Sequence, residues 1–260
     1  MSKRNRQKVF QILPLGKIIP NLATLSALFV GMMQIKFSLA YNWEFAILAV
    51  IGAAFLDAMD GRLARMFNAC SRFGAELDSL SDFAVFGVSP AVVIYIFSLH
   101  NFNRLGWMIS ALFAICMALR LARFNTNDIE NRKSPLSGSF FTGVPAPAGA
   151  VLGLFPIILY NATGCAIFKN PIICAANMLI VGILCISKIP TPSIKKFKIH
   201  RSQYTAFLLL VIITLGAAYA YTWKTLCIVV IAYIISIFIS YSKSKKLLMQ
   251  HKDDNHTATL

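Results

Sequence analysis

Long apolar runs separated by short polar segments make up most of the chain. Each run approaches the roughly 20 residues that a helix needs to cross a bilayer. The runs lie at about 18–36, 42–65, 79–99, 105–122, 140–160, 171–187, 205–221 and 224–241. This pattern predicts an all-α fold: a polytopic membrane helical bundle of about eight transmembrane helices, forming one domain over residues 18–241.

The two ends of the chain differ from this membrane domain. Residues 1–17 are basic, with apolar side chains between the charges, which is typical of a helix that lies on the membrane surface. The tail at residues 242–260 is polar, and we expect it to be disordered. The first apolar run is long for a signal peptide and lacks a small-residue cleavage motif, so we expect a retained membrane helix.

The composition supports the membrane interpretation. The chain is 57% hydrophobic and only 13% charged, and its mean hydropathy is +0.67. Its six cysteines are scattered, mostly inside apolar runs, and no two form a C-x2-C pair. We therefore interpret the cysteines as packing residues, and not as a disulfide framework or a zinc site.

The formal net charge of +15 raises the question of a nucleic-acid partner. If the N-terminus is cytoplasmic, all Lys and Arg residues fall on the cytoplasmic side except Lys36, Arg104, Lys169 and Lys224. This asymmetry follows the positive-inside rule and predicts that both termini are cytoplasmic. Topology and attraction to anionic membrane lipid then explain the charge, so we expect no nucleic-acid partner.

Four carboxylates, those of Asp57, Asp60, Asp78 and Asp82, lie at the junction of two apolar runs. On helices, the first two share one face and the last two share another. The short connection between the runs makes the helices antiparallel neighbours, so the two faces can meet. A single aspartate near a helix end is commonly only a cap, but four at this spacing must be protonated or bind cations.

The chemistry of these ligands narrows the choice of cation. Oxygen-only ligands favour hard divalent ions such as Mg²⁺ or Mn²⁺, and a pair of such ions favours phosphoryl chemistry. Gly61, Ala64 and Gly74 lie beside the carboxylates, where small residues let a ligand come close. Arg65 could contact a phosphate, or it could be only a topology signal.

The pattern D-x2-D-G-x2-A-R-x8-G-x3-D-x3-D resembles the signature of the CDP-alcohol phosphatidyltransferases. All eight fixed positions match: Asp57, Asp60, Gly61, Ala64, Arg65, Gly74, Asp78 and Asp82. The resemblance implies that Asp57, Asp60 and Asp78 bind divalent metal, two ions in all. It makes Asp82 the general base, which also touches the second metal. It assigns Gly61, Ala64, Arg65 and Gly74 to the cytidine diphosphate.

Segments outside the signature resemble the membrane-type phosphatidylserine synthases within this family. They read L-D-S-L-S-D-F-A-V-F-G-V-S-P-A from Leu77, R-L-A-R-F-N from Arg120, G-V-P-A-P-A from Gly143 and I-P-T-P-S-I-K-K-F from Ile189. The resemblance implies that the hydroxyl of L-serine attacks the β-phosphorus of CDP-diacylglycerol, which releases CMP and leaves phosphatidylserine. It also implies a homodimer. The expected location is a bacterial cytoplasmic membrane, and the Lys and Arg asymmetry predicts that the active site is on its cytoplasmic side.

Two further pairs of residues each have two interpretations. Asn21 and Thr24 follow Pro20 in a P-N-x-x-T segment that faces the nucleotide in similar proteins, although the same residues could simply start a helix. Arg120 and Arg123 lie three residues apart on one helix face and could jointly hold the serine carboxylate. Their alternative role is to set membrane topology.

Two alternative functions stay open at this point. A transferase of the same family that uses glycerol 3-phosphate, inositol or another alcohol would keep the same eight residues. A cation- or proton-coupled transporter would also place carboxylates in the membrane. The transporter is disfavoured because the acidic motif is not repeated along the chain and because transport does not require glycines at these offsets.

Overall fold

A computed structural model describes residues 15–67, 71–129, 140–187, 190–192 and 221–257, with isolated residues at 209, 214, 216 and 220. The first half contains α1 (Leu15–Leu39), α2 (Trp43–Met66), α3 (Arg72–Asp82), the π-helix η1 (Phe83–Val88), α4 (Ser89–Phe97), the 3₁₀ helix η2 (Leu99–Phe102) and α5 (Asn103–Ile129). The second half contains β1 (Phe140–Thr142), α6 (Ala146–Gly153), α7 (Phe155–Thr163), η3 (Ala166–Lys169), α8 (Pro171–Ile186), β2 (Pro190–Pro192) and α10 (Thr222–Thr257).

The described residues form a helical bundle, with one small exception to the all-α prediction. The three-residue strands β1 and β2 pair antiparallel, with Phe140 opposite Pro192. Strand β2 contains Pro190 and Pro192, and proline lacks the backbone N–H that a helix needs. The pair joins the segment after α5 to the segment after α8.

Membrane-span candidates were assessed by helix length and composition. In the described part of the chain, α1, α3 to α4, α5 and α10 are long and apolar enough to span a membrane, and the bent pair α6 and α7 would make a fifth span. Helix α2 carries the charged motif, and α8 has only 16 residues. The run predicted at 205–221 lies almost wholly outside the described residues, so the total of about eight spans stays a prediction.

The two ends were predicted to be an interfacial helix and a disordered tail. Residues 1–14 lie outside the described residues, and α1 begins at Leu15. The disorder predicted for the tail is wrong over most of its length, because α10 continues as a helix to Thr257. Lys, Leu, Met and Gln are good helix formers, so the polar composition of this segment does not prevent a helix.

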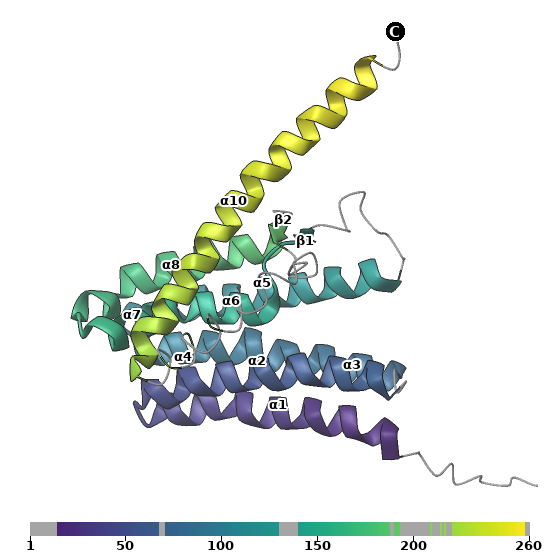
Figure 1. The fold of residues 1–260 in the computed structure, drawn as a ribbon. Coiled ribbons are helices and arrows are strands. Elements are labelled where there is room, and N and C mark those ends of the chain that lie inside the picture. The colour runs from purple at the N-terminus through teal and green to yellow at the C-terminus, as the bar shows by residue number, and fades with distance from the viewer. Residues whose placement is uncertain are drawn as a thin grey trace, which may run out of the picture.

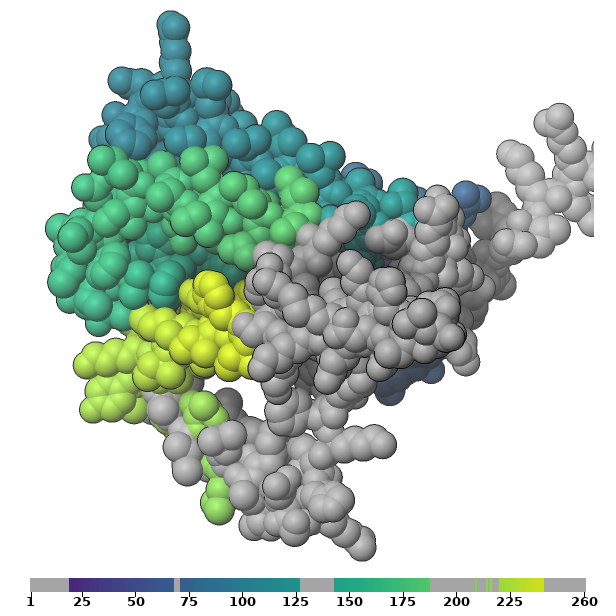
Figure 2. All heavy atoms as spheres, turned by 90° about the horizontal axis from the view of Figure 1, so that it is seen from above, coloured from purple at the N-terminus to yellow at the C-terminus, as the bar shows by residue number. Residues whose placement is uncertain are grey.

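The helices pack in two groups. Helices α1, α2 and α3 to α4 lie side by side, while α5, α6 and α8 form the second group and α10 runs obliquely across it (Figure 1). Seen from above, the first half of α10 lies beside the segment that contains α7 and α8 (Figure 2). The largest fully buried side chains come from both groups and include Ile47, Phe86, Phe97, Phe113, Met117, Ile157 and Met178. This shared core fixes the two groups against each other.

Side-chain caps determine where the helices of the acidic motif begin. The side chain of Asn42 accepts a hydrogen bond from the backbone N–H of Phe45 at the start of α2. Ser71 does the same for α3, with its Oγ 3.0 Å from the backbone nitrogen of Gly74. Since α2 ends at Met66 and α3 begins at Arg72, the C-terminus of α2 and the N-terminus of α3 lie at the same end of the bundle.

Candidate active site

Three carboxylates from two helices meet in the structure. Asp57 and Asp60 of α2 and Asp78 of α3 each offer an oxygen atom, and these atoms lie within 4.8 Å of one another. Asp60 is only 5% exposed, and its Oδ2 has no hydrogen-bond partner among the described residues. A buried carboxylate oxygen without a partner is costly, and hard oxygen ligands suit a divalent cation. The residues present therefore fit a metal site.

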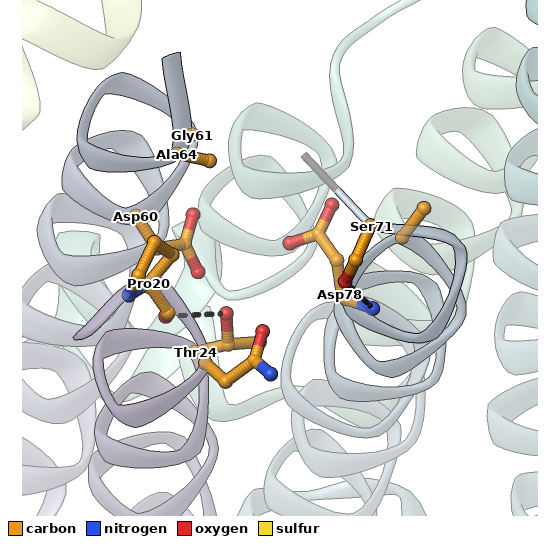
Figure 3. Close-up of a pocket in the computed structure, with 10 residues that line it drawn as sticks. Pro20, Thr24, Asp60, Gly61, Ala64, Ser71 and Asp78 are labelled. Atoms are coloured by element: carbon orange, nitrogen blue, oxygen red, sulfur yellow. Dashed lines mark hydrogen bonds between the residues drawn. The ribbon is translucent and has the colours of Figure 1, made fainter. Parts of the chain in front are cut away.

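A first cavity of about 150 Å³ opens beside these carboxylates. Its lining residues come from the start of α1, the end of α2 and the start of α3: Pro20, Asn21, Thr24, Asp60, Gly61, Ala64, Ser71, Gly74, Ala75 and Asp78. Asp60 and Asp78 face each other across the space, and Thr24 lies below them (Figure 3). The cavity thus brings together five residues that were predicted to contact the nucleotide: Asn21, Thr24, Gly61, Ala64 and Gly74.

The glycine at position 74 keeps this cavity open. A Cβ atom built there would lie 3.0 Å from Oδ1 of Asn21 and 3.1 Å from Oγ of Ser71, which is closer than most real contacts. At Gly61 the nearest atom to a built Cβ is a guanidinium nitrogen of Arg65, 4.0 Å away. Gly74 therefore lets Asn21 of α1 approach α3 closely, whereas Gly61 leaves open space in which a ligand can approach the backbone.

A second cavity, of about 230 Å³, includes the last residue of α3 in its lining. It is lined by Asp82, Arg120, Leu121, Phe124, Gly143, Pro145, Ala146 and Pro147. Asp82 is the last residue of α3, and its carboxyl is in hydrogen-bonding contact with that of Asp57. Asp82 thus touches the carboxylate cluster and also faces the second cavity, where it shares the lining with the guanidinium of Arg120.

Comparison with known proteins agrees with this arrangement. A family model described as CDP-alcohol phosphatidyltransferase matches residues 17–189, which is more than half of the chain and includes the whole carboxylate cluster. The chain belongs to the CDP-alcohol phosphatidyltransferase family.

Relatives within the CDP-alcohol phosphatidyltransferase family carry a more specific name. The chain is 39% identical over 181 residues to the CDP-diacylglycerol-serine O-phosphatidyltransferase of Helicobacter pylori, which covers 70% of this chain and 74% of that protein. It is 32% identical over 237 residues to the protein of that name from Mycobacterium tuberculosis, covering 91% and 82%. It is 34% identical over 178 residues to the one from Bacillus subtilis, covering 68% and 92%.

The structure places the signature arginine of the family outside the first cavity. Arg65 is exposed, and its Nε donates a hydrogen bond to the backbone oxygen of Gly61 at 2.9 Å, one turn earlier in α2. This bond holds the guanidinium against its own helix. The contact with phosphate that was expected of Arg65 therefore stays a prediction.

The two arginines that were expected to act together have different hydrogen-bond partners in the structure, and their joint role stays a prediction. Arg120 lines the second cavity, and its Nε donates to the backbone oxygen of Val144. Arg123 is not among the lining residues and donates instead to the backbone oxygens of Ile186 and Ser187, with 3.2 Å to the latter. These carbonyls end α8, and a helix C-terminus attracts cations because its last carbonyls have no helical partner.

Some residues of the two cavities were not anticipated from the sequence. Ser71 lines the first cavity while it caps α3, and an N-cap serine is a signal that the sequence does carry. Phe124 and Gly143 line the second cavity. Gly143 has φ of +80°, a left-handed conformation that favours glycine, and this turn leads the chain from β1 to α6 along the cavity wall.

Proposed function

We propose that this protein transfers a phosphatidyl group from CDP-diacylglycerol to the hydroxyl of L-serine, giving phosphatidylserine and CMP. The observation that carries the proposal is that the carboxylates connect two cavities: Asp60 and Asp78 line the first, and Asp82, which contacts Asp57, lines the second. A transfer between two substrates needs two such sites that share one reacting centre. The names of the relatives supply the identity of the substrates.

The first cavity is assigned to the cytidine diphosphate of the donor. Its small residues let the nucleotide approach the backbone of α2 and α3, and Asn21 and Thr24 offer polar groups from α1. Arg65 would reach the diphosphate from the rim. Asp57, Asp60, Asp78 and Asp82 would hold two divalent ions, Mg²⁺ or Mn²⁺, and bound metal would neutralise the diphosphate and the leaving CMP.

The second cavity is assigned to serine. Asp82 accepts the proton of the serine hydroxyl while the serine oxygen attacks the β-phosphorus. The bond between the β-phosphorus and the leaving CMP breaks. Arg120 lines the same cavity as Asp82 and binds the serine carboxylate, since a guanidinium can hold a carboxylate by two hydrogen bonds. Arg123 assists by holding the neighbouring end of α8, and its direct contact with serine is the less favoured form of the proposal.

The proposed setting is a bacterial cytoplasmic membrane. The distribution of Lys and Arg supports about eight spans over residues 18–241, with the basic segment 1–17 and the polar tail 242–260 both cytoplasmic. The active site would then open to the cytoplasm, where CDP-linked substrates and serine are present. The acyl chains would enter from the surrounding lipid, and we propose that two copies of the chain form a homodimer.

The release of CMP tests this proposal. Purified protein is incubated with CDP-diacylglycerol and Mn²⁺ or Mg²⁺, with and without L-serine, and parallel reactions contain glycerol 3-phosphate or inositol. We expect CMP release that depends on serine and on metal. Release that requires another alcohol would identify a different transferase of the same family, and no release with any alcohol would contradict the proposal.

A further inference from the structure

The helix that carries Asp78 and Asp82 changes its geometry immediately after Asp82. Residues Phe83–Val88 form the π-helix η1, and α-helical geometry returns at Ser89. A π turn holds about one residue more than an α turn, so it rotates the following helix face by roughly 100°. The acidic face of α3 and the buried face of α4 can therefore point in directions that one continuous α-helix would not allow.

Pro90 explains why one backbone carbonyl in this segment has no hydrogen-bond donor within its own helix. In π geometry the oxygen of Val85 would accept from residue 90, but proline has no N–H. The α-helical donor, the N–H of Ser89, is bonded to the oxygen of Ala84, and the Oγ of Ser89 donates to the same oxygen at 2.9 Å. Val85 is 1% exposed, so its carbonyl needs a donor from elsewhere in the protein.

Gln34 of α1 supplies that donor. Its side chain is fully buried, and its Nε2 lies 3.1 Å from the backbone oxygen of Val85, 51 residues later in the chain. Gly31, one turn earlier, makes the approach possible, because a Cβ built there would lie 2.5 Å from both γ-carbons of Val85. Two residues of α1 thus fit the π turn: one gives it room and the other gives it a hydrogen bond.

A second hydrogen bond joins α1 to this segment on the other side of Asp82, within α3. The Oγ of Ser81 donates to the backbone oxygen of Thr24 at 3.4 Å, and Thr24 lines the first cavity. The segment that carries Asp82 is therefore held to α1 at Ser81 and again at Val85. Two hydrogen bonds fix both the position of the segment along α1 and its rotation about its own axis, whereas one bond would leave the rotation free.

We infer that Gln34 is a positioning residue: its hydrogen bond to Val85 holds the π turn against α1 and so sets the direction in which Asp78 and Asp82 face Asp57 and Asp60. This inference rests on the proposed metal-dependent function of that cluster. The Oε1 of Gln34 is buried without a partner among the described residues. Because such an atom costs stability, tight packing alone would favour an apolar side chain here.

The test compares Gln34→Met, which keeps the length of the side chain but removes the donor, with Ser38→Ala as a matched control. Ser38 is buried one turn later in α1 and donates only to oxygens of its own helix, those of Gln34 and Ile35. Binding of Mn²⁺ to the folded, monodisperse protein is measured from the loss of the electron paramagnetic resonance signal of free Mn²⁺. Turnover and the KM for serine are measured on the same samples.

We expect Gln34→Met to weaken Mn²⁺ binding about fivefold and to lower kcat about tenfold, because small displacements of catalytic groups have effects of this size. The KM for serine and all properties of Ser38→Ala should stay close to wild type. If Gln34→Met lowers the melting temperature but binds Mn²⁺ with wild-type affinity, Gln34 only stabilises the fold and the inference is wrong.

Two further variants keep the inference testable if Gln34→Met does not fold. Gln34→Asn keeps the amide but withdraws it from Val85 by one methylene, so a smaller loss of Mn²⁺ affinity is expected. Gly31→Ala pushes Val85 away and should also weaken Mn²⁺ binding. Gly52→Ala is its control and should keep wild-type Mn²⁺ affinity, since a Cβ there meets Val30 at an ordinary 3.5 Å. Wild-type Mn²⁺ affinity in both Gln34→Asn and Gly31→Ala would overturn the inference. Absence of phosphatidyl transfer in the wild type would overturn the proposed function, whereas the comparison of Mn²⁺ affinities among the variants would still test the inference.

Discussion

The two cavities beside α3 are built in different ways. The first is lined by residues from three consecutive segments, the start of α1, the end of α2 and the start of α3, and it contains small and acidic residues. The second combines the end of α3 with the second half of α5 and with the turn from Gly143 to Pro147. It contains an arginine and larger side chains.

This difference matches the two substrates that the proposal assigns. A diphosphate bound through metal needs carboxylates and close access to the backbone, which short-range spacing along two helices can provide. A small zwitterion such as serine needs a cation at a defined distance from the base, which here requires contacts between distant segments. Variants in the first cavity should therefore change the KM for CDP-diacylglycerol, and variants in the second should change the KM for serine.

The largest effect is expected at the carboxylate cluster. Asp78→Asn removes a charge from the cluster and should lower turnover by about 10³-fold or more, because a missing ligand weakens the metal that both substrates depend on. Loss of Mn²⁺ binding, measured by titration, should accompany it. Glu76→Gln is the matched control, since Glu76 is exposed on the same helix. Normal metal binding in Asp78→Asn would contradict the assignment.

Asp82→Asn should separate chemistry from binding. Its carboxyl faces the second cavity, so its loss should lower kcat by about 10²-fold, the scale of a general base, while CDP-diacylglycerol still binds. Single-turnover kinetics and equilibrium binding of the donor check this. Donor affinity that falls in parallel with kcat would make Asp82 chiefly a metal ligand.

Arg120→Lys and Arg123→Lys test the separation of the two arginines. Both keep the positive charge that sets topology but remove the planar guanidinium. Arg120→Lys should raise the KM for serine about tenfold, equivalent to roughly 1.4 kcal/mol, with the KM for CDP-diacylglycerol unchanged. Arg123→Lys should chiefly lower the melting temperature, since it loses the bonds to the end of α8. An equal rise of the KM for serine in both variants would support the prediction that the two arginines form a joint site.

Gly74→Ala should have the smallest effect. The added methyl group would crowd Asn21 and Ser71, so the KM for CDP-diacylglycerol should rise about threefold to tenfold while the KM for serine stays unchanged. Initial rates at varied donor concentration measure this. A rise in the KM for serine instead would mean that the first cavity does not hold the donor.

The sequence predicted the first cavity well because its chemistry is local. Asp57, Asp60 and Asp78 lie at helical spacing on two connected helices, so periodicity alone brings them together. The P-N-x-x-T segment assigned Asn21 and Thr24 to the nucleotide site only through resemblance, because no local rule predicts that the start of α1 packs against the start of α3.

The second cavity and the π turn were beyond local reasoning. The spacing of Arg120 and Arg123 is correct for a shared ligand, but the carbonyls that hold Arg123 lie 63 and 64 residues later in the chain. Pro90 removes a backbone donor, but the way in which the helix adapts depends on a donor from Gln34, which lies in another helix. Such contacts depend on tertiary packing, which single-sequence patterns do not contain.

The most direct test of the account is the identity of the lipid product in a competition experiment. Purified protein in CDP-diacylglycerol vesicles with Mn²⁺ is given equal concentrations of L-serine, glycerol 3-phosphate and inositol, and the lipids are analysed by mass spectrometry while CMP is quantified. The account predicts phosphatidylserine as the main product, in a one-to-one ratio with CMP, and a shift away from serine in Arg120→Lys but not in Arg123→Lys. A different phospholipid as the main product, or CMP release without any new phospholipid, would contradict it.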